Sequence, residues 1–397
     1  MTSPPRDISI DLVDGGFYGG NPYPAFKWMR DHAPAFYDEA NGVWGITRYG
    51  DIRAISRDAK TFSSKNGIRP DTGALPMMID MDDPEHSRRR KLVSSGFTPK
   101  KIRDLQDHIA TVCDLIIDRV CTVGTCDFVK DIAAPLPMIL IGDMLGIAPQ
   151  DRDDLLRWSD VMLSALGSSD PNAMLNAATA FNEYTAYIGK VIDERRVDGK
   201  QDDLTGTLVH AIVEGDYLDD ASLVHETLLI LIGGDETTRH VISGGYYELL
   251  THPDQLSLLA NNPSIMNSAI EECLRWVSPI KNMARSATRD VELHGQTIRQ
   301  DQKLLLLYPS ANRDERQFED PDDFNIQRTP NDHIAFGFGP HFCMGNQLAR
   351  LELRVMFSKL LSRLPDLRLV DPQEPQRRCA NFVSGFESMP VEFTPTE

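Results

Sequence analysis

The 397-residue sequence predicts a mainly α-helical fold with a small β portion. Apolar residues recur at helical spacing in three stretches, 86–270, 264–276 and 345–364. Strand signals lie in three others, 43–47, 283–308 and the tail from 378. The sequence contains no internal repeat, low-complexity block or linker, so we expect a single domain over 1–397 whose minor sheet lies near the N-terminus.

Along the chain, the first ~75 residues mix helix and strand signals, as judged from local sequence patterns alone. Residues 43–47 read as a strand, and Tyr49-Gly50 as the turn after it. Farther along, Thr98-Pro99 and Ser222 are residue types that begin helices. The last long helix is predicted to follow Gly345 and to continue without a breaker until Pro365.

Composition narrows the classes of protein. Hydrophobic residues make up 41% of the chain and charged residues 25%, which is typical of a globular protein. A net charge of −18 argues against nucleic-acid binding, which needs a basic surface. No apolar run approaches the ~20 residues that span a bilayer, and the N-terminus lacks a signal-peptide pattern, so we expect no membrane anchor. The six cysteines are scattered without a Cys-x-x-Cys pair, which indicates a reducing, cytoplasmic location.

Residues 336–345, Phe-Gly-Phe-Gly-Pro-His-Phe-Cys-Met-Gly, are the most informative segment. Glycines at 337, 339 and 345 allow tight turns and close approach to a flat ligand. Cys343 stands just before the predicted helix, where unpaired N–H groups and the helix dipole favour a thiolate. A thiolate can ligate a metal, and a haem iron is one candidate; the alternative is a structural cysteine.

The spacing Phe-x-x-Gly-x-His-x-Cys-x-Gly resembles the haem-ligand loop of the cytochromes P450. The resemblance extends over nearly the whole chain and implies the cytochrome P450 fold. It also implies a haem b cofactor whose iron is ligated by Cys343. Because the chain shows neither a membrane helix nor room for a fused reductase, electrons are expected from a separate protein.

A second motif, Gly233-Gly234-Asp235-Glu236-Thr237-Thr238, interrupts a long apolar helix pattern. Each interior glycine costs roughly 0.5–1 kcal/mol against alanine, so a purely structural helix gains nothing from the pair. The stretch resembles the P450 central-helix motif, which implies that Glu236 and Thr237 are catalytic and deliver protons during oxygen activation. The alternative is a solvent-exposed helix cap.

A third motif, Glu272-x-x-Arg275, places two opposite charges on one helix face. By itself it is an ordinary surface ion pair worth under ~1 kcal/mol. The family resemblance implies that the pair joins Arg328 and braces the cysteine loop, so we expect these three residues to be structural.

A fourth motif supplies anion-binding groups. His86 and Arg90 share a helix face, and an arginine fork suits a carboxylate. The resemblance assigns this helix to the haem propionates, with Arg285 and His341 completing the cofactor-binding set. A basic group is also expected to steer an acidic ferredoxin, which its own reductase supplies with electrons, toward the protein: Arg88, Arg89, Lys91, Lys100 and Lys101. For Arg88 and Arg89, a plain solvated face is the preferred interpretation.

Apolar and methionine-rich segments predict an apolar substrate pocket. The residues expected to line it are Met78, Ile79, Leu229, Ile232, Gly233, Met283 and Val383. Segments 74–84, 231–240 and 380–390 resemble the actinobacterial P450s that oxidise the cholesterol side chain. This implies dioxygen-dependent, ferredoxin-fed hydroxylation of the terminal (26/27) methyl of cholesterol or cholest-4-en-3-one, with possible oxidation to the acid. The alternatives are a hydroxylase of fatty acids or another lipid, and a non-catalytic haem-thiolate sensor.

Overall fold

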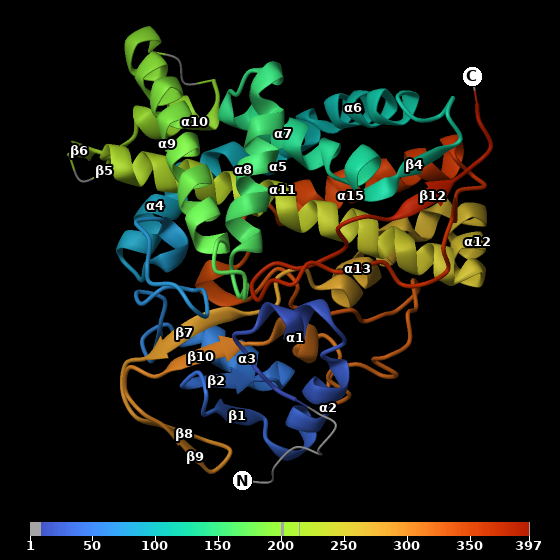
Figure 1. The fold of residues 1–397 in the computed structure, drawn as a ribbon. Coiled ribbons are helices and arrows are strands. Elements are labelled where there is room, and N and C mark those ends of the chain that lie inside the picture. The colour runs from blue at the N-terminus through green and yellow to red at the C-terminus, as the bar shows by residue number, and fades with distance from the viewer. Residues whose placement is uncertain (1–8, 200–201, 214, 397) are drawn as a thin grey trace.

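The computed structural model describes residues 9–199, 202–213 and 215–396, and Figure 1 shows a helical body above a small sheet. The α-helices are α1 (Gly15–Gly19), α2 (Tyr23–His32), α3 (Tyr49–Arg57), α4 (Glu85–Ser94), α5 (Pro99–Asp104), α6 (Gln106–Asp118), α7 (Pro135–Leu145), α8 (Arg152–Ser164), α9 (Ala173–Asp198), α10 (Leu204–Val209), α11 (Asp220–Thr251), α12 (Pro253–Asn261), α13 (Met266–Val277), α14 (Tyr308–Ala311) and α15 (Asn346–Arg363). The strands are β1 (Ala35–Asp38), β2 (Val43–Ile46), β3 (Phe62–Ser63), β4 (Thr125–Asp127), β5 (Ile212–Val213), β6 (Asp216–Tyr217), β7 (Met283–Ala287), β8 (Val291–Leu293), β9 (Gln296–Ile298), β10 (Lys303–Leu306), β11 (Arg368–Leu369) and β12 (Pro390–Glu392). The predicted mainly α class is confirmed.

The largest sheet has the strand order β1-β2-β10-β7-β3. It pairs strands from residues 35–63 with strands from residues 283–306. Strand β10 runs parallel to β2, with Leu304 opposite Trp44, and antiparallel to β7, with Leu304 opposite Arg285. Leu304, Leu305 and Leu306 are fully buried, because both faces of this central strand are covered. The sheet therefore fixes β7, and with it Arg285, against the helical body.

Helix α11 is the longest helix and crosses the middle of the molecule (Figure 1). It packs against α7, α13 and α15. Asp219 caps its start, accepting a hydrogen bond from the backbone N–H of Ser222 at 2.7 Å. The predicted cap at Ser222 was therefore wrong by three residues, since an acidic cap satisfies the third N–H of the helix. The predicted cap at Thr98 is confirmed.

The helix after the cysteine loop, α15, ends at Arg363. Pro365 explains the end, because a proline disfavours helical backbone in the residue before it. None of the described helices combines the length and hydropathy that crossing a membrane requires.

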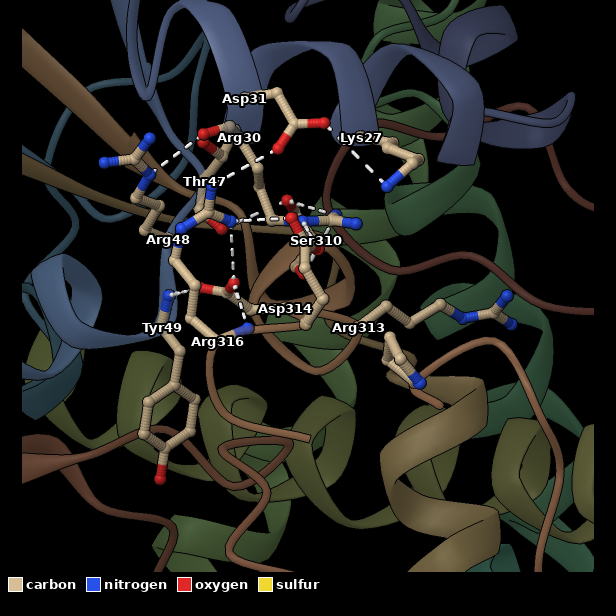
Figure 2. A network of polar contacts seen from close by, with 12 residues as sticks. Lys27, Arg30, Asp31, Thr47, Arg48, Tyr49, Ser310, Arg313, Asp314 and Arg316 are labelled. Carbon is tan, nitrogen blue, oxygen red and sulfur yellow. Dashed lines mark hydrogen bonds and ion pairs between the residues drawn. The ribbon is translucent and has the colours of Figure 1, made fainter. Parts of the chain in front are cut away.

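Figure 2 shows how α2 is tied to the segment after the sheet. Arg30 is only 2% exposed, and its guanidinium donates to the carbonyl and hydroxyl oxygens of Ser310, each at 3.2 Å. It also pairs with Glu315 at 3.2 Å. The backbone N–H of Tyr49 donates to Asp314 at 2.9 Å, which extends the network to α3. These contacts join residues nearly 300 positions apart.

The C-terminal segment 376–389 passes beside the turn between α8 and α9. The N–H of Asn381 donates to the carbonyl of Leu166 at 3.1 Å, and the N–H of Lys281 donates to Phe382 at 2.8 Å. Val383 forms an isolated bridge with Ile280. The segment thereby forms a wall next to α11 and β7.

Candidate active site

A cavity of about 230 Å³ opens between α4, α11, α15, β7 and the loop 335–345. Its walls include most of the residues singled out from the sequence: His86, Arg90, Thr237, Arg285, His341, Cys343, Met78, Ile79, Leu229, Gly233 and Met283. Segments as far apart in the sequence as Met78 and Cys343 therefore meet at one place.

The cysteine loop is held in a defined shape. The N–H of Cys343 donates to the carbonyl of Phe336 at 2.9 Å, and the side-chain amide of Asn346 donates to the Cys343 carbonyl at 2.8 Å. Gly337 and Gly339 have φ angles of 71° and 76°, so both need glycine. A Cβ on Gly339 would lie 2.2 Å from the Ser56 carbonyl oxygen, which shows how closely the loop approaches α3. Gly345 differs from these two glycines, because its φ is −77°, at the start of α15.

Burial raises the pKa of the Cys343 thiol. This effect outweighs the opposite effects of the N–H groups of Gly345 and Asn346 and of the charges of Arg90 and Arg350. The N–H groups at the helix start do favour the thiolate, as expected, but desolvation is the larger effect. A cation bound at sulfur is what would stabilise the thiolate here.

Four basic side chains converge on one side of the cavity. The rings of His86 and His341 lie 4.0 Å apart, centroid to centroid, and Arg90 donates to the carbonyl of Phe342. Arg285 is 4% exposed and donates to the Ala284 carbonyl at 2.7 Å. Within the described part of the chain it forms no ion pair with a carboxylate. Burial and the neighbouring charges of Arg285, His86 and Arg90 lower the pKa of His341 to about 2.

This arrangement fits haem. Burial beside one another disfavours the charged forms of Arg90, Arg285, His86 and His341, and two carboxylates at this position would relieve that cost. The same cavity presents the thiol of Cys343 and apolar walls, as a flat macrocycle carrying two propionates and an iron requires. The residues present therefore match the cofactor implied by the sequence motif.

The two predicted relay residues lie in different surroundings. Thr237 faces the cavity, and its hydroxyl donates to the Gly233 carbonyl at 3.0 Å. Glu236 is fully buried and does not line the cavity. It pairs with Arg239 at 2.5 Å and with Arg378 at 3.1 Å. The exposed-cap alternative is excluded, because Glu236 lies in the interior.

The two arginines that pair with Glu236 also bind a second carboxylate. Both also contact Asp160 of α8, Arg239 at 2.7 Å and Arg378 at 2.8 Å. Sequence reasoning missed these partners, because Arg378 lies 142 positions from Glu236 and no local pattern links them. The acid of the central helix is thus tied to α8 and to the C-terminal segment.

The structure brings the predicted brace together. Arg275 donates to both carboxylate oxygens of Glu272, at 2.8 and 2.7 Å, and Arg328 donates to the same carboxylate at 3.2 Å. Both Glu272 and Arg275 are fully buried, so this is no ordinary surface pair. Arg275 also donates to the Asn312 carbonyl at 2.9 Å.

The expected substrate residues divide into two groups. Met78, Ile79, Leu229, Gly233 and Met283 line the cavity, whereas Ile232 and Val383 belong to an adjacent apolar cluster with Ile68, Leu163, Leu166 and Phe382. Ile79 and Met283 pack against that cluster as well, so it backs the cavity wall.

The predicted basic group is only partly exposed. Arg88, Lys91, Lys100 and Lys101 are exposed. Arg89 instead turns inward and pairs with the buried Glu226 of α11 at 3.2 Å. The interpretation of Arg89 as a solvated residue was wrong, because a buried carboxylate needs a cationic partner.

Comparison with known proteins agrees with this geometry. The Cytochrome P450 family model matches residues 259–383, a range that holds the brace and the cysteine loop. The steroid C26-monooxygenase of Mycolicibacterium smegmatis is 52% identical, over 98% of this chain and 96% of that protein. The steroid C26-monooxygenase of Mycobacterium tuberculosis is also 52% identical, over 100% and 99%.

Solved structures show the same fold. A cytochrome P450 of Mycobacterium marinum, CYP268A2, in complex with pseudoionone superposes with a TM-score of 0.89 at 33% identity, covering 99% of this chain and 100% of that one. CYP109E1 of Bacillus megaterium, in complex with testosterone, gives a TM-score of 0.88 at 30% identity, covering 95% and 98%.

Proposed function

This chain belongs to the cytochrome P450 family, and we propose on that premise that it hydroxylates the terminal side-chain methyl of a steroid such as cholesterol or cholest-4-en-3-one. The observation that carries the proposal is a cavity that joins Cys343 and four propionate-type partners to apolar walls. The steroid itself is inferred from the relatives that are 52% identical.

Haem b, when bound, supplies the oxygen activation: one dioxygen, two electrons and two protons convert R–H into R–OH and water. Cys343 would ligate the iron, and His86, Arg90, Arg285 and His341 would hold the propionates. Met78, Ile79, Leu229 and Met283 would exclude water and orient the apolar end of the substrate. The Thr237 hydroxyl faces the cavity, where it can hold and pass a proton.

A P450 of this kind needs a redox partner, and we infer that the partner is an acidic ferredoxin with its reductase. The supporting observation is the exposed basic group Lys91, Lys100 and Lys101 beside the cysteine loop. Phe97, between α4 and α5, lies 3.9 Å from the Cβ position of Gly345. All six cysteines are free, which suits a reducing compartment, and we propose that the protein works in the cytoplasm.

The test is a titration of the Soret band of the purified holoprotein with cholest-4-en-3-one, cholesterol and a long-chain fatty acid. We expect the steroids to shift the band. Turnover with ferredoxin, reductase and NADH should yield a steroid with a terminal hydroxyl, identified by mass spectrometry and NMR. Fatty-acid hydroxylation without a steroid shift would favour the lipid alternative. A carbon monoxide difference band without any product would favour the sensor.

A pair of variants tests the pocket itself. Met78 is 7% exposed and lines the cavity, whereas Met174 is 60% exposed at the start of α9. Met78→Trp should weaken steroid binding roughly 5- to 150-fold, since overpacking costs about 1–3 kcal/mol. Met174→Trp should leave it unchanged. Equal affinities in the two variants would contradict the assignment of this cavity to the steroid.

A further inference from the structure

The acid that the motif predicts as the proton donor is held in its charged form. Burial opposes that charge, but Arg239 and Arg378 outweigh it and hold the pKa of Glu236 well below its usual range. Their ion pairs with Glu236 measure 2.5 and 3.1 Å. In this arrangement Glu236 carries no proton at neutral pH, and its side chain does not line the cavity.

A different carboxyl faces the cavity. Glu352 lies on α15, is 3% exposed and lines the same cavity as Cys343 and Thr237. Its Oε2 is buried and has no hydrogen-bond partner. Across residues 9–199, 202–213 and 215–396, no group donates a hydrogen bond to this carboxyl and no cation pairs with it. A charged carboxyl is strongly disfavoured in such a place, so the side chain is expected to be a neutral acid.

Asp235 lies on α11, which packs against α15, and it is an electrostatic neighbour of Glu352. It is fully buried; Ser159 of α8 donates to its Oδ2 at 3.2 Å, and its Oδ1 has no partner. Burial raises the pKa of Asp235 to about 8, against the pull of Arg239.

Burial raises the pKa of Glu352 well above its usual range, and any charge on the neighbouring Asp235 would raise it further. The buried thiol of Cys113 on α6 also lies near Glu352, and it supplies no positive charge.

We propose that Glu352, a buried carboxyl that lines the haem cavity and whose Oε2 has no hydrogen-bond partner among the described residues, is a second proton donor of that cavity. The proposal rests on the monooxygenase function, because each turnover consumes two protons that end in water. A proton given up by Glu352 leaves a carboxylate, which takes a proton from solvent before the next turnover. The O–H bond of the acid breaks, the base that receives the proton gains one, and no electron moves in this step.

The first experiment looks for the proton directly, by difference infrared spectroscopy of the ferric holoprotein near neutral pH. A protonated carboxyl has a carbonyl stretching band that a carboxylate lacks. We expect a band that disappears in Glu352→Gln, shifts in Asp235→Asn and remains in Glu236→Gln. A spectrum of Glu352→Gln that keeps every carboxylic-acid band of the wild type would overturn the proposal.

The second experiment measures product formed per NADH and the solvent deuterium isotope effect on turnover. Glu352→Gln should lower the rate of product formation by roughly 10²-fold, the low end for loss of a positioned acid, and should change the isotope effect. Glu352→Asp, which keeps a carboxyl, should recover part of the loss. Wild-type coupling and an unchanged isotope effect in Glu352→Gln would refute the role.

The two proposals fail in different ways. If the wild-type enzyme gives no steroid product, the proposed function fails while the infrared band still decides whether Glu352 holds a proton. If Glu352→Gln does not retain haem, as judged by its carbon monoxide difference band, Asp235→Asn takes its place. Asp235 does not line the cavity, and an unshifted Glu352 band in that variant would contradict the coupling of the two acids.

Discussion

Arg275 is fully buried, and its donors reach acceptors on three separate parts of the chain. It binds both oxygens of Glu272 within α13, the Asn312 carbonyl at 2.9 Å and the Pro321 carbonyl at 2.8 Å. Such a charge is tolerated only because each partner is present. It fixes the segment that leads into the cysteine loop relative to α13.

Arg275→Ala should therefore lower the free energy of unfolding by about 3–5 kcal/mol, the usual cost of breaking a buried pair. The measurement is urea unfolding followed by circular dichroism, together with the haem content of the purified protein. Arg299→Ala is the control, because Arg299 and its partner Asp290 have side chains 66% and 53% exposed. That change should cost less than about 1 kcal/mol. Equal losses in the two variants would refute the role of the brace.

Site residues could be predicted where their role depends on neighbours close in the sequence. Cys343, His86, Arg90 and His341 lie within short motifs whose spacing survives folding, and all four line the cavity. The charged state of Glu236 could not be predicted, because it depends on Arg378, 142 positions away. Glu352 gave no signal either, since an acid on an amphipathic helix looks the same in sequence whether it faces solvent or a cavity.

At the scale of one element, the two kinds of glycine in α11 differ in what surrounds them. A Cβ on Gly233 would meet nothing within 4 Å, because Gly233 faces the cavity. A Cβ on Gly245 would lie 2.8 Å from Cβ and 2.9 Å from Sγ of Cys273 on α13. Gly245 thus lets α11 and α13 pack closely, whereas Gly233 leaves room at the cofactor.

The two alanine variants should shift stability in opposite directions. Gly233→Ala should raise the free energy of unfolding by about 0.5–1 kcal/mol, because alanine favours helix over glycine. Gly245→Ala should lower it by about 1–3 kcal/mol through overpacking. Urea unfolding of both variants, read by circular dichroism, makes the comparison. Stabilisation by Gly245→Ala would show that α11 and α13 do not pack as described.

An ion-pair cluster joins α13 to α15 below the cysteine loop. Arg350 of α15 donates to the Glu271 carboxylate at 2.6 and 2.8 Å, and the ring of His333 lies 3.0 Å from the same group. Burial alone would raise the pKa of Glu271, but these partners hold it at about 2, against 4.5 ordinarily. The cluster connects the brace helix to the helix that follows the ligand.

Because that folded-state pKa is depressed, the contribution of Glu271 to stability is fully present above pH 4.5 and is lost as the pH falls toward about 2. Glu271→Gln should therefore destabilise the protein clearly near neutral pH, and the difference from wild type should shrink between those two values. Unfolding free energies measured across this range decide the matter, with Glu39→Gln at an exposed position as the control. A difference that does not change with pH would exclude an electrostatic role.

Among the elements, apolar periodicity located the helices that lie around the cavity, because each helix is formed by one uninterrupted stretch of sequence. It could not indicate that β10 pairs in parallel with β2, which brings residue 303 beside residue 43. Such pairing depends on tertiary contacts such as those of Arg30, which no local pattern encodes.

At the scale of the whole molecule, the contacts between distant segments favour a single cooperative unit, as the sequence predicts. The sheet combines strands from both halves of the chain, and Arg30 of α2 is buried against Ser310 and Glu315. We propose that the part of the molecule that holds the β1-β2-β10-β7-β3 sheet (the sheet end) and the helical body unfold together. Urea transitions followed by tryptophan fluorescence, circular dichroism and the Soret band should coincide, since Trp28 and Trp44 lie in the sheet end and Trp158 in the helical body. Two separated transitions would indicate two domains.

The distribution of charge bears on electron transfer. The chain carries a net charge of −18, yet Lys91, Lys100 and Lys101 are exposed together on α4 and α5. Helix α5 packs against α15, close to the loop that carries Cys343. The acidic ferredoxin that we propose would be attracted here against the negative net charge of the chain, so the local charge would favour that partner and one orientation of it.

Salt should weaken this attraction. Raising the ionic strength from about 0.1 M to about 1 M shortens the Debye length from about 10 Å to about 3 Å. The kcat/KM for ferredoxin should then fall about 10-fold or more, while steroid binding, measured by the Soret shift, should not change. Combining Lys91→Gln, Lys100→Gln and Lys101→Gln should produce most of that loss at low salt and leave little further salt dependence. Lys27→Gln, an exposed change on α2, is the matched control. If the triple variant keeps the wild-type rate and salt dependence, the ferredoxin docks elsewhere, and the basic group is only a solvated face.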